Sequence, residues 1–430
     1  MALAPGLDPA AFALGGKVPL RALAPASIEE LAAVVKACNE AGEAVVVFGG
    51  GTLQGIGFSP ARYNIAISTA RLDKVLEYEF RDLTISVECG RSVERLNATL
   101  AERGQFVPLD APSPGLSSVG GLLASGWSGP RRATFGRPRD FVIGSTVVLA
   151  DGTVAKAGGM VVKNVTGYDM SKLWCGSLGT LAVLARANFK TLPLPETTRV
   201  ALAALPERTR RRAVEHVAAL DVEPSVAIAL HGFPEAGGRD GQEGRLFLMF
   251  EGSHTLVDRA TRDLRSAIGA AGVPETTLLD GTAATSAFAR LLDAYGARLG
   301  ERSLTYRSCG LPGEALSRCD ALAHAATRHE LHAESLLDIL GGDAYVRVST
   351  KLTAEFAAAV ERLDASLGTS SPTYTIFNAP EMLRDGLKMW GNEMTSPATQ
   401  RDIKHRFDPK ATFAPGRFAG RANCSEGKRA

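Results

Sequence analysis

The sequence has little net charge and no long hydrophobic run. Its 430 residues include 48 lysines and arginines and 46 aspartates and glutamates, which gives a formal net charge of +2. The pair Arg131-Arg132 and the arginine triplet at 210–212 are short and isolated. This balance argues against binding to nucleic acid or to an anionic membrane surface. No apolar run approaches the roughly 18 to 20 residues that span a bilayer, so we expect no transmembrane segment.

Cysteine and histidine are also scarce. The six cysteines are scattered and never form a Cys-x-x-Cys pair, and the chain has seven histidines. This pattern argues against an iron–sulfur cluster or a structural zinc held within the chain, and it is typical of a reducing compartment. The first basic residue is Lys17, whereas a secretory signal begins with positive charge. We therefore expect a cytoplasmic protein with no metal site and no secretory signal.

Glycine, in contrast, is abundant and clustered. Many of the 45 glycines fall in three segments, at 49–57, 110–121 and 158–180, where they stand beside small hydroxyl residues and other polar groups. A buried core has no use for bare backbone of this kind, whereas a large phosphate-bearing ligand requires the main chain to approach closely. The three segments therefore predict the binding of one cofactor.

The first glycine segment follows a predicted helix and strand. Ser27 and Glu30 form a capping box at the start of a helix, and a buried strand at 44–48 leads into the segment 49–57. The dinucleotide fingerprint Gly-x-Gly-x-x-Gly does not fit, because its third glycine would fall on Gln54. We interpret the segment as a nest of backbone N–H groups around phosphate oxygens, with a surface turn as the alternative.

The remaining patterns predict an α+β organisation in which the pattern of strands and helices changes after Pro195. Before it we expect a helix at 91–104, a hairpin turn at Asp151-Gly152 and strands at 64–68, 83–88, 141–149 and 181–189. From about 196 to 395, short strands alternate with Ala/Arg-rich helices such as 207–219 and 254–270. This alternation predicts a separate antiparallel sheet with helices on one face.

Three histidines fall on one predicted helix of this second part. His324, His329 and His332 lie within 320–337. Their spacing is compatible with a metal-binding face, but no carboxylate signature accompanies it. A solvated helix face is the favoured interpretation.

Four motifs, taken in order, carry a resemblance to a known family. They are Val-Phe-Gly-Gly-Gly-Thr at 47–52, Ser-Ser-Val-Gly-Gly at 117–121, Gly-Tyr-Asp-Met-Ser-Lys-Leu with Gly-Ser-Leu-Gly-Thr-Leu at 167–181, and Asp-Pro…Pro-Gly-Arg at 408–417. Together they resemble the flavoproteins whose FAD-binding domain is shared by vanillyl-alcohol oxidase, D-lactate dehydrogenase and the glycolate oxidase subunits. The resemblance implies an α+β fold. A two-subdomain FAD-binding domain would comprise 1–195 and the returning segment 396–430, and an α+β, ferredoxin-like cap domain would comprise 196–395.

The resemblance also implies which residues bind the cofactor. The residues at matching positions, expected to contact the diphosphate, the flavin edge, the ribityl chain or the adenosine, are Phe48, Gly49, Gly50, Gly51, Thr52, Pro112, Ser117, Ser118, Val119, Gly120, Gly121, Ser125, Asp140, Ile143, Gly176, Leu181 and Val183. Some family members attach the flavin through a histidine in the first glycine loop. That place is Thr52 here, so noncovalent FAD is expected. The tail carries Ala414 where the family usually has asparagine, which removes one flavin-ring contact.

A closer resemblance concerns function. Gly-Pro-Arg-Arg at 129–132, Arg-Asp-Phe-Val-Ile-Gly at 139–144 and Val-Lys-Asn-Val-Thr-Gly-Tyr-Asp at 162–169 resemble the FAD-binding subunits of bacterial glycolate oxidase. This implies a small 2-hydroxy acid as substrate, a related flavoprotein subunit and an iron–sulfur subunit as partners, and membrane association only through those partners. The histidine-rich substrate signature of the family's hydroxy-acid dehydrogenases is missing; the nearest stretch, at 341–347, has no histidine.

The chemistry of such a reaction requires specific groups. A cation must hold the substrate carboxylate, a base must accept the hydroxyl proton, and the α-carbon must face the flavin. Arginine suits the first task because its fork matches a carboxylate. The candidates for these catalytic roles are Arg131, Arg347, Lys163 and Tyr168, with Arg132 beside them. The alternative interpretations are ion pairs, contacts with a partner subunit or simple packing.

Three hypotheses follow for the function of the chain. It is a flavin subunit that oxidises a 2-hydroxy acid and passes electrons on. Alternatively, it is an FAD-containing structural or electron-relay subunit whose sister subunit performs the chemistry. The third is a stand-alone FAD-dependent oxidase of the same fold that acts on another alcohol or a sugar.

Overall fold

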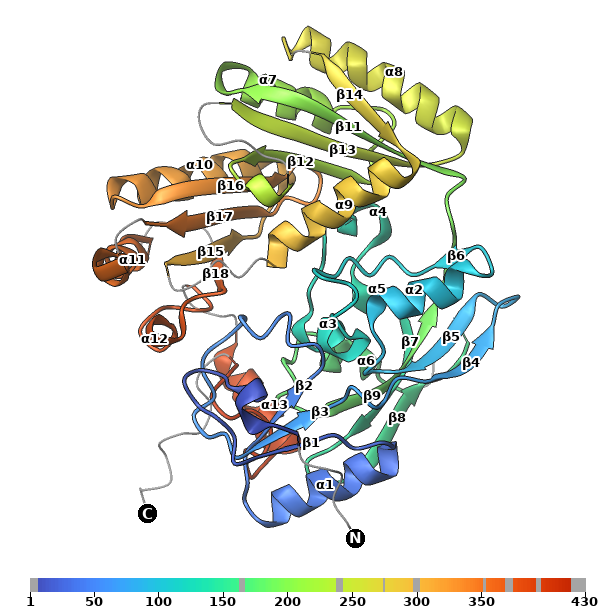
Figure 1. Ribbon diagram of the computed structural model, residues 1–430, viewed down its shortest axis with the longest axis vertical. Coiled ribbons are helices and arrows are strands. Elements are labelled where there is room, and N and C mark those ends of the chain that lie inside the picture. Colours follow the sequence, from blue (N-terminus) through green and yellow to red (C-terminus); the bar gives the residue numbers. More distant parts are fainter. Residues whose placement is uncertain are drawn as a thin grey trace. The chain divides into compact units, whose positions relative to one another are not determined.

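The chain folds into two units, seen in a computed structural model (Figure 1). The first unit comprises Met1–Ser128, Arg137–Leu194 and Glu393–Ala430, and the second comprises Gly129–Gly136 and Pro195–Asn392. The structure describes residues 7–161, 167–236, 243–273, 275–296, 302–350, 353–367, 374–391 and 396–418. The sequence-based division placed residues 129–136 in the FAD-binding domain, whereas their contacts place them in the second unit.

The first unit begins with a three-stranded parallel sheet covered by one helix. The strands are β1 (Arg21–Leu23), β3 (Ile65–Ser68) and β2 (Val45–Phe48), in that order. Helix α1 (Ile28–Glu40) starts at Ser27, whose hydroxyl accepts a hydrogen bond from the Glu30 amide at 3.1 Å. The Glu30 carboxylate accepts one from the Ala26 amide at 2.7 Å, so the predicted helix start is confirmed. The apolar face of α1 packs into a core with these strands.

A five-stranded antiparallel sheet forms the second layer of the first unit. Its strands, in spatial order, are β4 (Val75–Glu79), β5 (Thr84–Glu88), β9 (Val183–Lys190), β7 (Val142–Val148) and β8 (Val154–Gly158). Strands β7 and β8 form the predicted hairpin, with Gly152 at φ +86° in its turn. The accompanying elements are η1 (Pro9–Phe12), α2 (Val93–Ala101), α3 (Val119–Ser125), α5 (Pro138–Phe141), α6 (Ser171–Trp174) and the β6 (Gln105–Phe106) and β10 (Leu192–Pro193) pair.

The C-terminal segment returns to the first unit. Helix α13 (Pro397–Phe407) leads into a tail in which Phe413 forms a parallel bridge with Val45. The Val45 amide donates to the Thr412 carbonyl, and the Ala414 amide donates to the Val45 carbonyl, each at 2.7 Å. Because β2 lies at the end of its sheet, the tail covers a strand edge whose polar groups need partners.

The second unit is built from two copies of one βαββαβ motif. The first copy contains β11 (Thr197–Pro206), α7 (Glu207–Ala218), β12 (Val226–His231), β13 (Glu243–Gly252), α8 (His254–Ala270) and β14 (Thr276–Asp280). The second contains β15 (Ser303–Ser308), α10 (Pro312–Arg328), β16 (His332–Asp338), β17 (Ala344–Ser349), α11 (Thr353–Leu367) and β18 (Tyr374–Phe377). Pairing of β12 with β16 gives one antiparallel sheet in the order β14-β11-β13-β12-β16-β17-β15-β18 (Figure 1). Each half is ferredoxin-like, as predicted.

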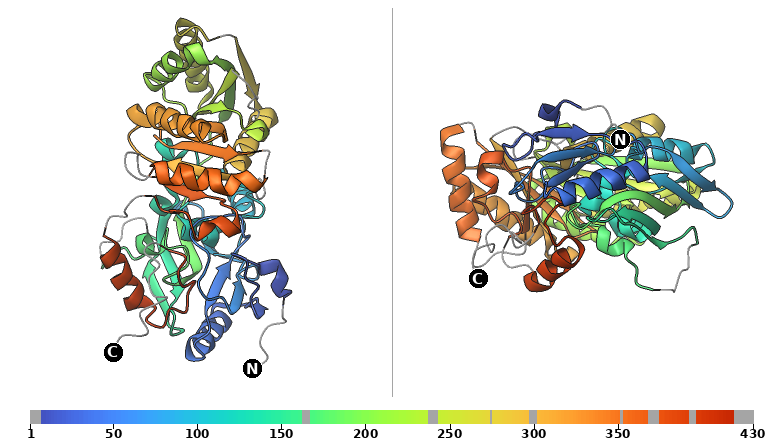
Figure 2. Two further views of the ribbon diagram at one scale, coloured as in Figure 1. Left: turned by 90° about the vertical axis from the view of Figure 1, so that its left-hand side faces the viewer. Right: turned by 90° about the horizontal axis from the view of Figure 1, so that it is seen from below.

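Helices cover both faces of this sheet. Helix α7 contacts α8, and α10 contacts α11, each pair packing on its own half. Helix α9 (Gly281–Gly296) packs with η2 (Pro234–Ala236) against β11 on the opposite face (Figure 2). The prediction of helices on one face is therefore wrong for α9. This helix connects β14 at one end of the sheet with β15 near the other, so it must cross the face that the other helices leave open. The short helices α4 (Arg132–Phe135) and α12 (Glu381–Arg384) complete the unit.

The predicted helix at 320–337 is wrong in its second half. Helix α10 ends at Arg328, and β16 begins at His332. Glu330 adopts φ +61° between them, a left-handed conformation that a helix cannot continue through. His324 therefore lies on the helix, His329 on its cap and His332 on a strand. The three histidines do not share one helix face.

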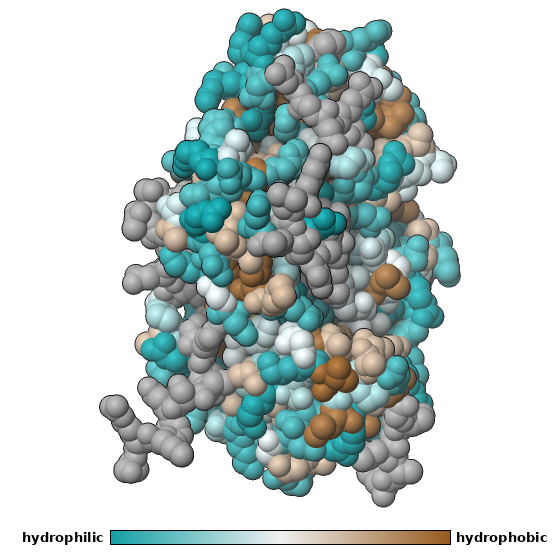
Figure 3. Space-filling model, turned by 60° about the vertical axis from the view of Figure 1, so that its left-hand side comes forward, coloured by the Kyte–Doolittle hydropathy of each residue, from teal (hydrophilic) through white to brown (hydrophobic). Residues whose placement is uncertain are grey.

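On the face drawn in Figure 3, hydrophobic side chains lie in small groups among polar ones. Within the part of the chain that the structure describes, no helix combines the length and the apolar character that crossing a membrane requires.

Candidate cofactor-binding site

Four segments that are far apart in the sequence line one cleft of the first unit. They are the loop after β2, the start of α3, the segment before β9 and the C-terminal tail, and they surround about 680 Å³ of space. The described lining residues are Val47, Gly49, Gly50, Gly51, Thr52, Leu53, Gln54, Thr69, Ser118, Gly120, Gly121, Ala124, Ser125, Leu178, Gly179, Ala182, Val183, Leu184 and Arg417. Among them Arg417 is the one ionisable side chain. The lining thus offers hydroxyls, exposed main chain and a positive charge, which suits an anionic ligand.

The loop after β2 can approach its neighbour only because it begins with glycines. A Cβ atom on Gly49 would lie 1.8 Å from the Ser118 hydroxyl oxygen, and one on Gly50 would lie 1.7 Å from the Leu116 carbonyl oxygen. Gly51 has φ +72°, which favours glycine. The hydroxyls of Thr52 and Ser117 lie 2.7 Å apart and link the two segments.

The second glycine segment is fixed by the connection between β5 and α2. The Val119 amide donates to the Arg91 carbonyl at 2.9 Å, and the Gly120 amide donates to the Cys89 carbonyl at 2.7 Å. Ser118 caps α3 by accepting a hydrogen bond from the Gly121 amide at 3.1 Å. The position of the cleft wall therefore depends on the conformation of the residues around Arg91.

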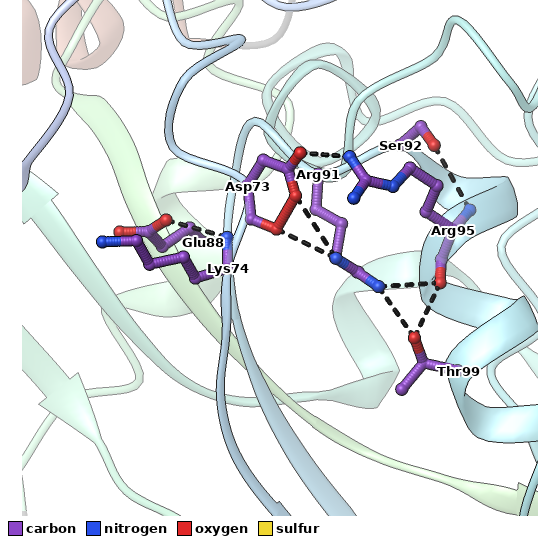
Figure 4. A network of polar contacts seen from close by, with 7 residues as sticks. All are labelled: Asp73, Lys74, Glu88, Arg91, Ser92, Arg95 and Thr99. Atoms are coloured by element: carbon purple, nitrogen blue, oxygen red, sulfur yellow. Dashed lines mark hydrogen bonds and ion pairs between the residues drawn. The ribbon is translucent and has the colours of Figure 1, made fainter.

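A polar network holds that connection in place (Figure 4). The buried Arg91 guanidinium donates to the Asp73 carbonyl at 2.9 Å, to the Arg95 carbonyl at 3.1 Å and to the Thr99 hydroxyl at 2.7 Å. The Asp73 carboxylate also pairs with Arg95. Burial lowers the pKa of Arg91, and the neighbouring Asp73 charge opposes that shift. Arg91 thereby ties α2 to the residues after β5, whose carbonyls accept hydrogen bonds from the second glycine segment.

The third segment is attached directly to α3. The Gly176 amide donates to the Leu123 carbonyl at 2.9 Å, and the Leu178 amide donates to the Ala124 carbonyl at 2.7 Å. Gly176 and Gly179 have φ +84° and +66°, as turn glycines do. A Cβ on Gly126 would lie 2.9 Å from the Gly176 Cα, so the two backbones are in direct contact.

The predicted cofactor residues divide into three groups. Nine of them line the cleft, namely Gly49, Gly50, Gly51, Thr52, Ser118, Gly120, Gly121, Ser125 and Val183. The structure thus brings together parts of all three glycine segments. The absence of side chains at Gly49 and Gly50 lets this loop pack directly against Ser118 and Leu116, and the cleft between the segments is lined by main chain and hydroxyls. A group that carries a diphosphate fits such a lining.

Several of the other predicted residues support the cleft. Val119 is buried, and the Ser117 hydroxyl donates to the Pro112 carbonyl at 2.5 Å. Phe48 packs against Phe12, with ring centres 5.2 Å apart, on the face of β2 opposite Val47.

The remaining four predicted cofactor residues line other cavities of the first unit. Gly176 and Leu181 border a cavity of about 780 Å³ next to α13. Asp140 and Ile143 border another of about 820 Å³, together with Tyr168.

Among the lining residues with polar side chains, the sequence-based interpretation missed Gln54, Thr69 and Arg417. Gln54 was considered only as the residue that breaks the dinucleotide fingerprint. Arg417 belongs to the tail motif at 408–417, whose resemblance was the one available signal. Its position beside the first glycine loop arises from contacts across more than 360 residues of sequence separation.

The structure places the candidate Arg347 within the second unit, in a buried charge cluster. Arg347 is 3% exposed, and its guanidinium pairs with the Glu334 carboxylate at 2.9 Å and with Glu235. It also lies 4.0 Å from the centre of the Phe233 ring. These contacts argue for a structural role and against a substrate-binding one.

The two adjacent arginines of the second unit are likewise bound to carboxylates. Arg131 pairs with Glu251 at 3.1 Å and lies 5.0 Å from the Phe288 ring centre. Arg132 pairs with Asp343 at 2.9 Å and with Asp338 at 3.7 Å. Both anchor residues 129–136 to the second unit.

Asp338 gives this cluster a pH dependence. Burial raises the pKa of Asp338 from 3.8 to about 6, although the Gly341 amide and the Arg132 charge oppose the shift. The folded protein therefore binds this proton more tightly than the unfolded chain, and stability falls as the pH rises from about 4 to about 6. Asp338→Asn keeps an oxygen for the Gly341 amide but carries no charge. We expect it to gain about 1 to 3 kcal/mol relative to the native protein above pH 6 and little below pH 4.

Thermal and urea unfolding between pH 4 and pH 8 measure this difference. Asp258→Asn, at an exposed carboxylate of the same unit, controls for the loss of a carboxylate in general. Parallel stability curves for Asp338→Asn and the native protein across this window would show that Asp338 is not the titrating group.

The last two candidates are Tyr168 and Lys163. Tyr168 is 93% exposed. Lys163 lies outside the described residues. Among the residues that the structure describes, no cluster of three or more His, Cys, Asp or Glu side chains could hold a metal ion.

Comparison with known families indicates which cofactor the chain binds. Residues 19–158 match the FAD binding domain family. This segment contains the first two glycine segments in full, and the chain therefore binds FAD.

Curated relatives match over part of their length. The chain is 32% identical over 186 residues to glycolate oxidase subunit GlcD of Bacillus subtilis, covering 43% of this chain and 40% of that protein. It is 33% identical over 191 residues to glycolate oxidase subunit GlcE of Escherichia coli, covering 44% and 51%. It is 35% identical over 188 residues to D-2-hydroxyglutarate dehydrogenase of Xanthomonas citri, covering 44% and 40%. The alignments thus span only about half or less of these relatives.

Solved structures agree over nearly the whole chain. The structure of p-cresol methylhydroxylase with substrate bound has a TM-score of 0.69 at 15% identity and covers 93% of this chain and 88% of its own. Alkyldihydroxyacetonephosphate synthase has a TM-score of 0.69 at 16% identity, with coverage of 93% and 76%. These similarities confirm the predicted α+β fold class.

Proposed function

We propose that this chain is the FAD-binding subunit of a complex that oxidises a small 2-hydroxy acid such as glycolate, and that it resembles the E subunit of glycolate oxidase. The observation that carries the proposal is the convergence of three glycine segments and the tail on one cleft. The similarity to two glycolate oxidase subunits supports the substrate class. A related flavoprotein subunit and an iron–sulfur subunit are the proposed partners, in the cytoplasm or at a membrane reached through them.

In this proposal the residues of the cleft bind and orient the cofactor. FAD, when bound, accepts a hydride from the carbon that carries the substrate hydroxyl. The main chain at Gly49–Gly51 and at Gly120–Gly121 would approach the diphosphate. The Thr52 hydroxyl lies 2.7 Å from the Ser117 hydroxyl, and the Ser118 hydroxyl accepts a hydrogen bond from the Gly121 amide. Thr52 is not a residue to which flavin is attached in this family, so the cofactor is held noncovalently.

A second candidate function follows from the arginines of the second unit. Arg131, Arg132 and Arg347 are all paired with carboxylates, so none of these candidates presents an uncompensated charge to a substrate carboxylate. This observation favours a subunit that carries FAD and relays electrons while a sister subunit binds the substrate.

Reconstitution of the complex tests both functions. We expect the purified chain to contain FAD that is released on denaturation without proteolysis. Glycolate should bleach the visible flavin absorbance of this chain when the partner subunits are present. Bleaching without partners would assign the substrate site to this chain. Turnover by a complex in which substitutions in the cleft prevent this chain from binding FAD would assign the substrate site to the sister subunit. Bleaching by other alcohols or sugars but not by 2-hydroxy acids would overturn the proposal in favour of a stand-alone oxidase.

A further inference from the structure

The C-terminal tail contributes an arginine to the first glycine loop. Arg417 is 2% exposed and lines the cleft, although it lies more than 360 residues beyond the loop. Its guanidinium donates to the Gln54 side-chain oxygen at 2.8 Å and to the Ile56 carbonyl at 2.8 Å. The Phe58 amide donates to the Arg417 carbonyl at 3.1 Å. Both the side chain and the main chain of Arg417 therefore bond to the segment at 54–58.

Gln54 connects this contact to the strand that carries the loop. Its side-chain nitrogen donates to the Val47 carbonyl at 3.2 Å, while its side-chain oxygen accepts from Arg417. The loop between Val47 and Phe58 is thus fixed at the strand, at its middle and at its end. Glycine-rich loops lose much conformational entropy on ordering, so an anchor of this kind decreases the cost of binding a ligand.

The charge of Arg417 is placed where a diphosphate needs it. Among the described residues that line the cleft, Arg417 is the one ionisable side chain. Arginine binds phosphate well because its donors form a rigid fork with a permanent charge. A buried positive charge on the wall of a narrow cleft is screened little by solvent.

The tail also holds the third segment of the cleft. Buried Lys404 donates to the Thr180 carbonyl at 2.6 Å and to the Phe413 carbonyl at 2.9 Å, and it pairs with Asp408. Asp408 in turn accepts hydrogen bonds from the amides of Thr412 and Phe413 at 2.8 and 2.7 Å. The tail that presents Arg417 is therefore itself rigidly placed.

From these contacts we infer that Arg417 is a cofactor-positioning residue. It holds the loop at 49–57 in the conformation that receives the diphosphate and supplies the positive charge on the cleft wall. The inference rests on the FAD cleft described above, and it adds a role for the tail that the glycine motifs do not contain.

The test is FAD binding by the apoprotein of the full chain. We expect Arg417→Gln to weaken FAD binding about 10- to 100-fold, the effect of losing a charge-assisted hydrogen bond to an anion. Arg417→Lys keeps the charge without the fork and should fall between this variant and the native protein. Hydrogen exchange should show faster amide exchange in residues 49–57 of Arg417→Gln, a readout that does not depend on activity.

Arg62→Gln is the matched control. Arg62 also bonds the tail, through the Ala411 carbonyl at 3.1 Å, but it is exposed and does not line the cleft. Its FAD affinity should stay within about two-fold of native, since surface contacts contribute little. If a folded Arg417→Gln protein binds FAD as the native protein does, the inference is wrong.

If Arg417→Gln does not fold, Gln54→Met decides the question. This variant removes the oxygen that accepts from Arg417 and leaves the charge in place. We expect FAD binding several-fold weaker than native, and unchanged binding would overturn the inference. A native protein that binds no FAD would instead refute the proposed function, so the two failures are distinguishable.

Discussion

Replacing Gly50 with alanine is expected to weaken FAD binding at least about 100-fold and to yield a colourless protein. A Cβ on Gly50 would lie 1.7 Å from the Leu116 carbonyl oxygen and 2.5 Å from its carbon. Both are backbone atoms, so no side-chain rotation relieves the clash, and the first two glycine segments must separate. Titration of the apoprotein with FAD and the visible absorbance of the purified protein measure the effect.

Gly269→Ala provides the matched control for this substitution. Gly269 lies near the end of helix α8, and a Cβ there would meet no atom within 4 Å. We expect native FAD affinity and a gain of about 0.5 to 1 kcal/mol in helix stability. Native FAD affinity in Gly50→Ala would show that the two segments need not touch when the cofactor is bound.

Replacing Arg347 with methionine is expected to destabilise the second unit by about 3 to 5 kcal/mol. The substitution leaves the carboxylates of Glu334 and Glu235 without their shared cation in a buried site. It also removes a hydrogen bond of 3.2 Å to the Ala294 carbonyl, by which β17 is tied to α9. Urea unfolding of the full chain, followed by circular dichroism, measures the loss. FAD binding at low urea should remain native.

Two further variants separate a structural role from a catalytic one. Adding Glu334→Gln to Arg347→Met should recover part of the stability, because the amide keeps an oxygen for the Phe233 amide and removes one buried charge. Arg199 lies on β11 of the same sheet and pairs with two exposed carboxylates, so Arg199→Gln should cost less than about 1 kcal/mol. Native stability of Arg347→Met together with lost reduction by substrate would return Arg347 to the catalytic role.

Local signals in the sequence predicted most of the first unit. The capping box at Ser27, the turn at Asp151-Gly152 and the glycine loop after β2 each depend on residues within a few positions of one another. Helix caps and tight turns are specified by such short-range chemistry, so a single sequence suffices to find them. The convergence of the three glycine segments was inferred from the family resemblance and from the composition that they share.

What the sequence did not predict depends on distant contacts. Glu330 ends a helical pattern by adopting a left-handed conformation, which nothing in its residue type requires. The two halves of the second unit share strand order but no evident sequence repeat, because many sequences satisfy the same alternation of strands and helices. Arg131 and Arg132 belong to the second unit through carboxylates more than 100 residues away.

The return of the tail to β2 has a consequence for synthesis on the ribosome. Val45 leaves the exit tunnel about 370 residues before Phe413, a delay of roughly 20 to 70 s at about 5 to 20 residues per second. During that interval the outer edge of β2 has no strand partner from the tail, and the nascent chain presents it to chaperones or to mispairing. The loop at 49–57 therefore gains its contacts with Arg417 only once the tail has been synthesised.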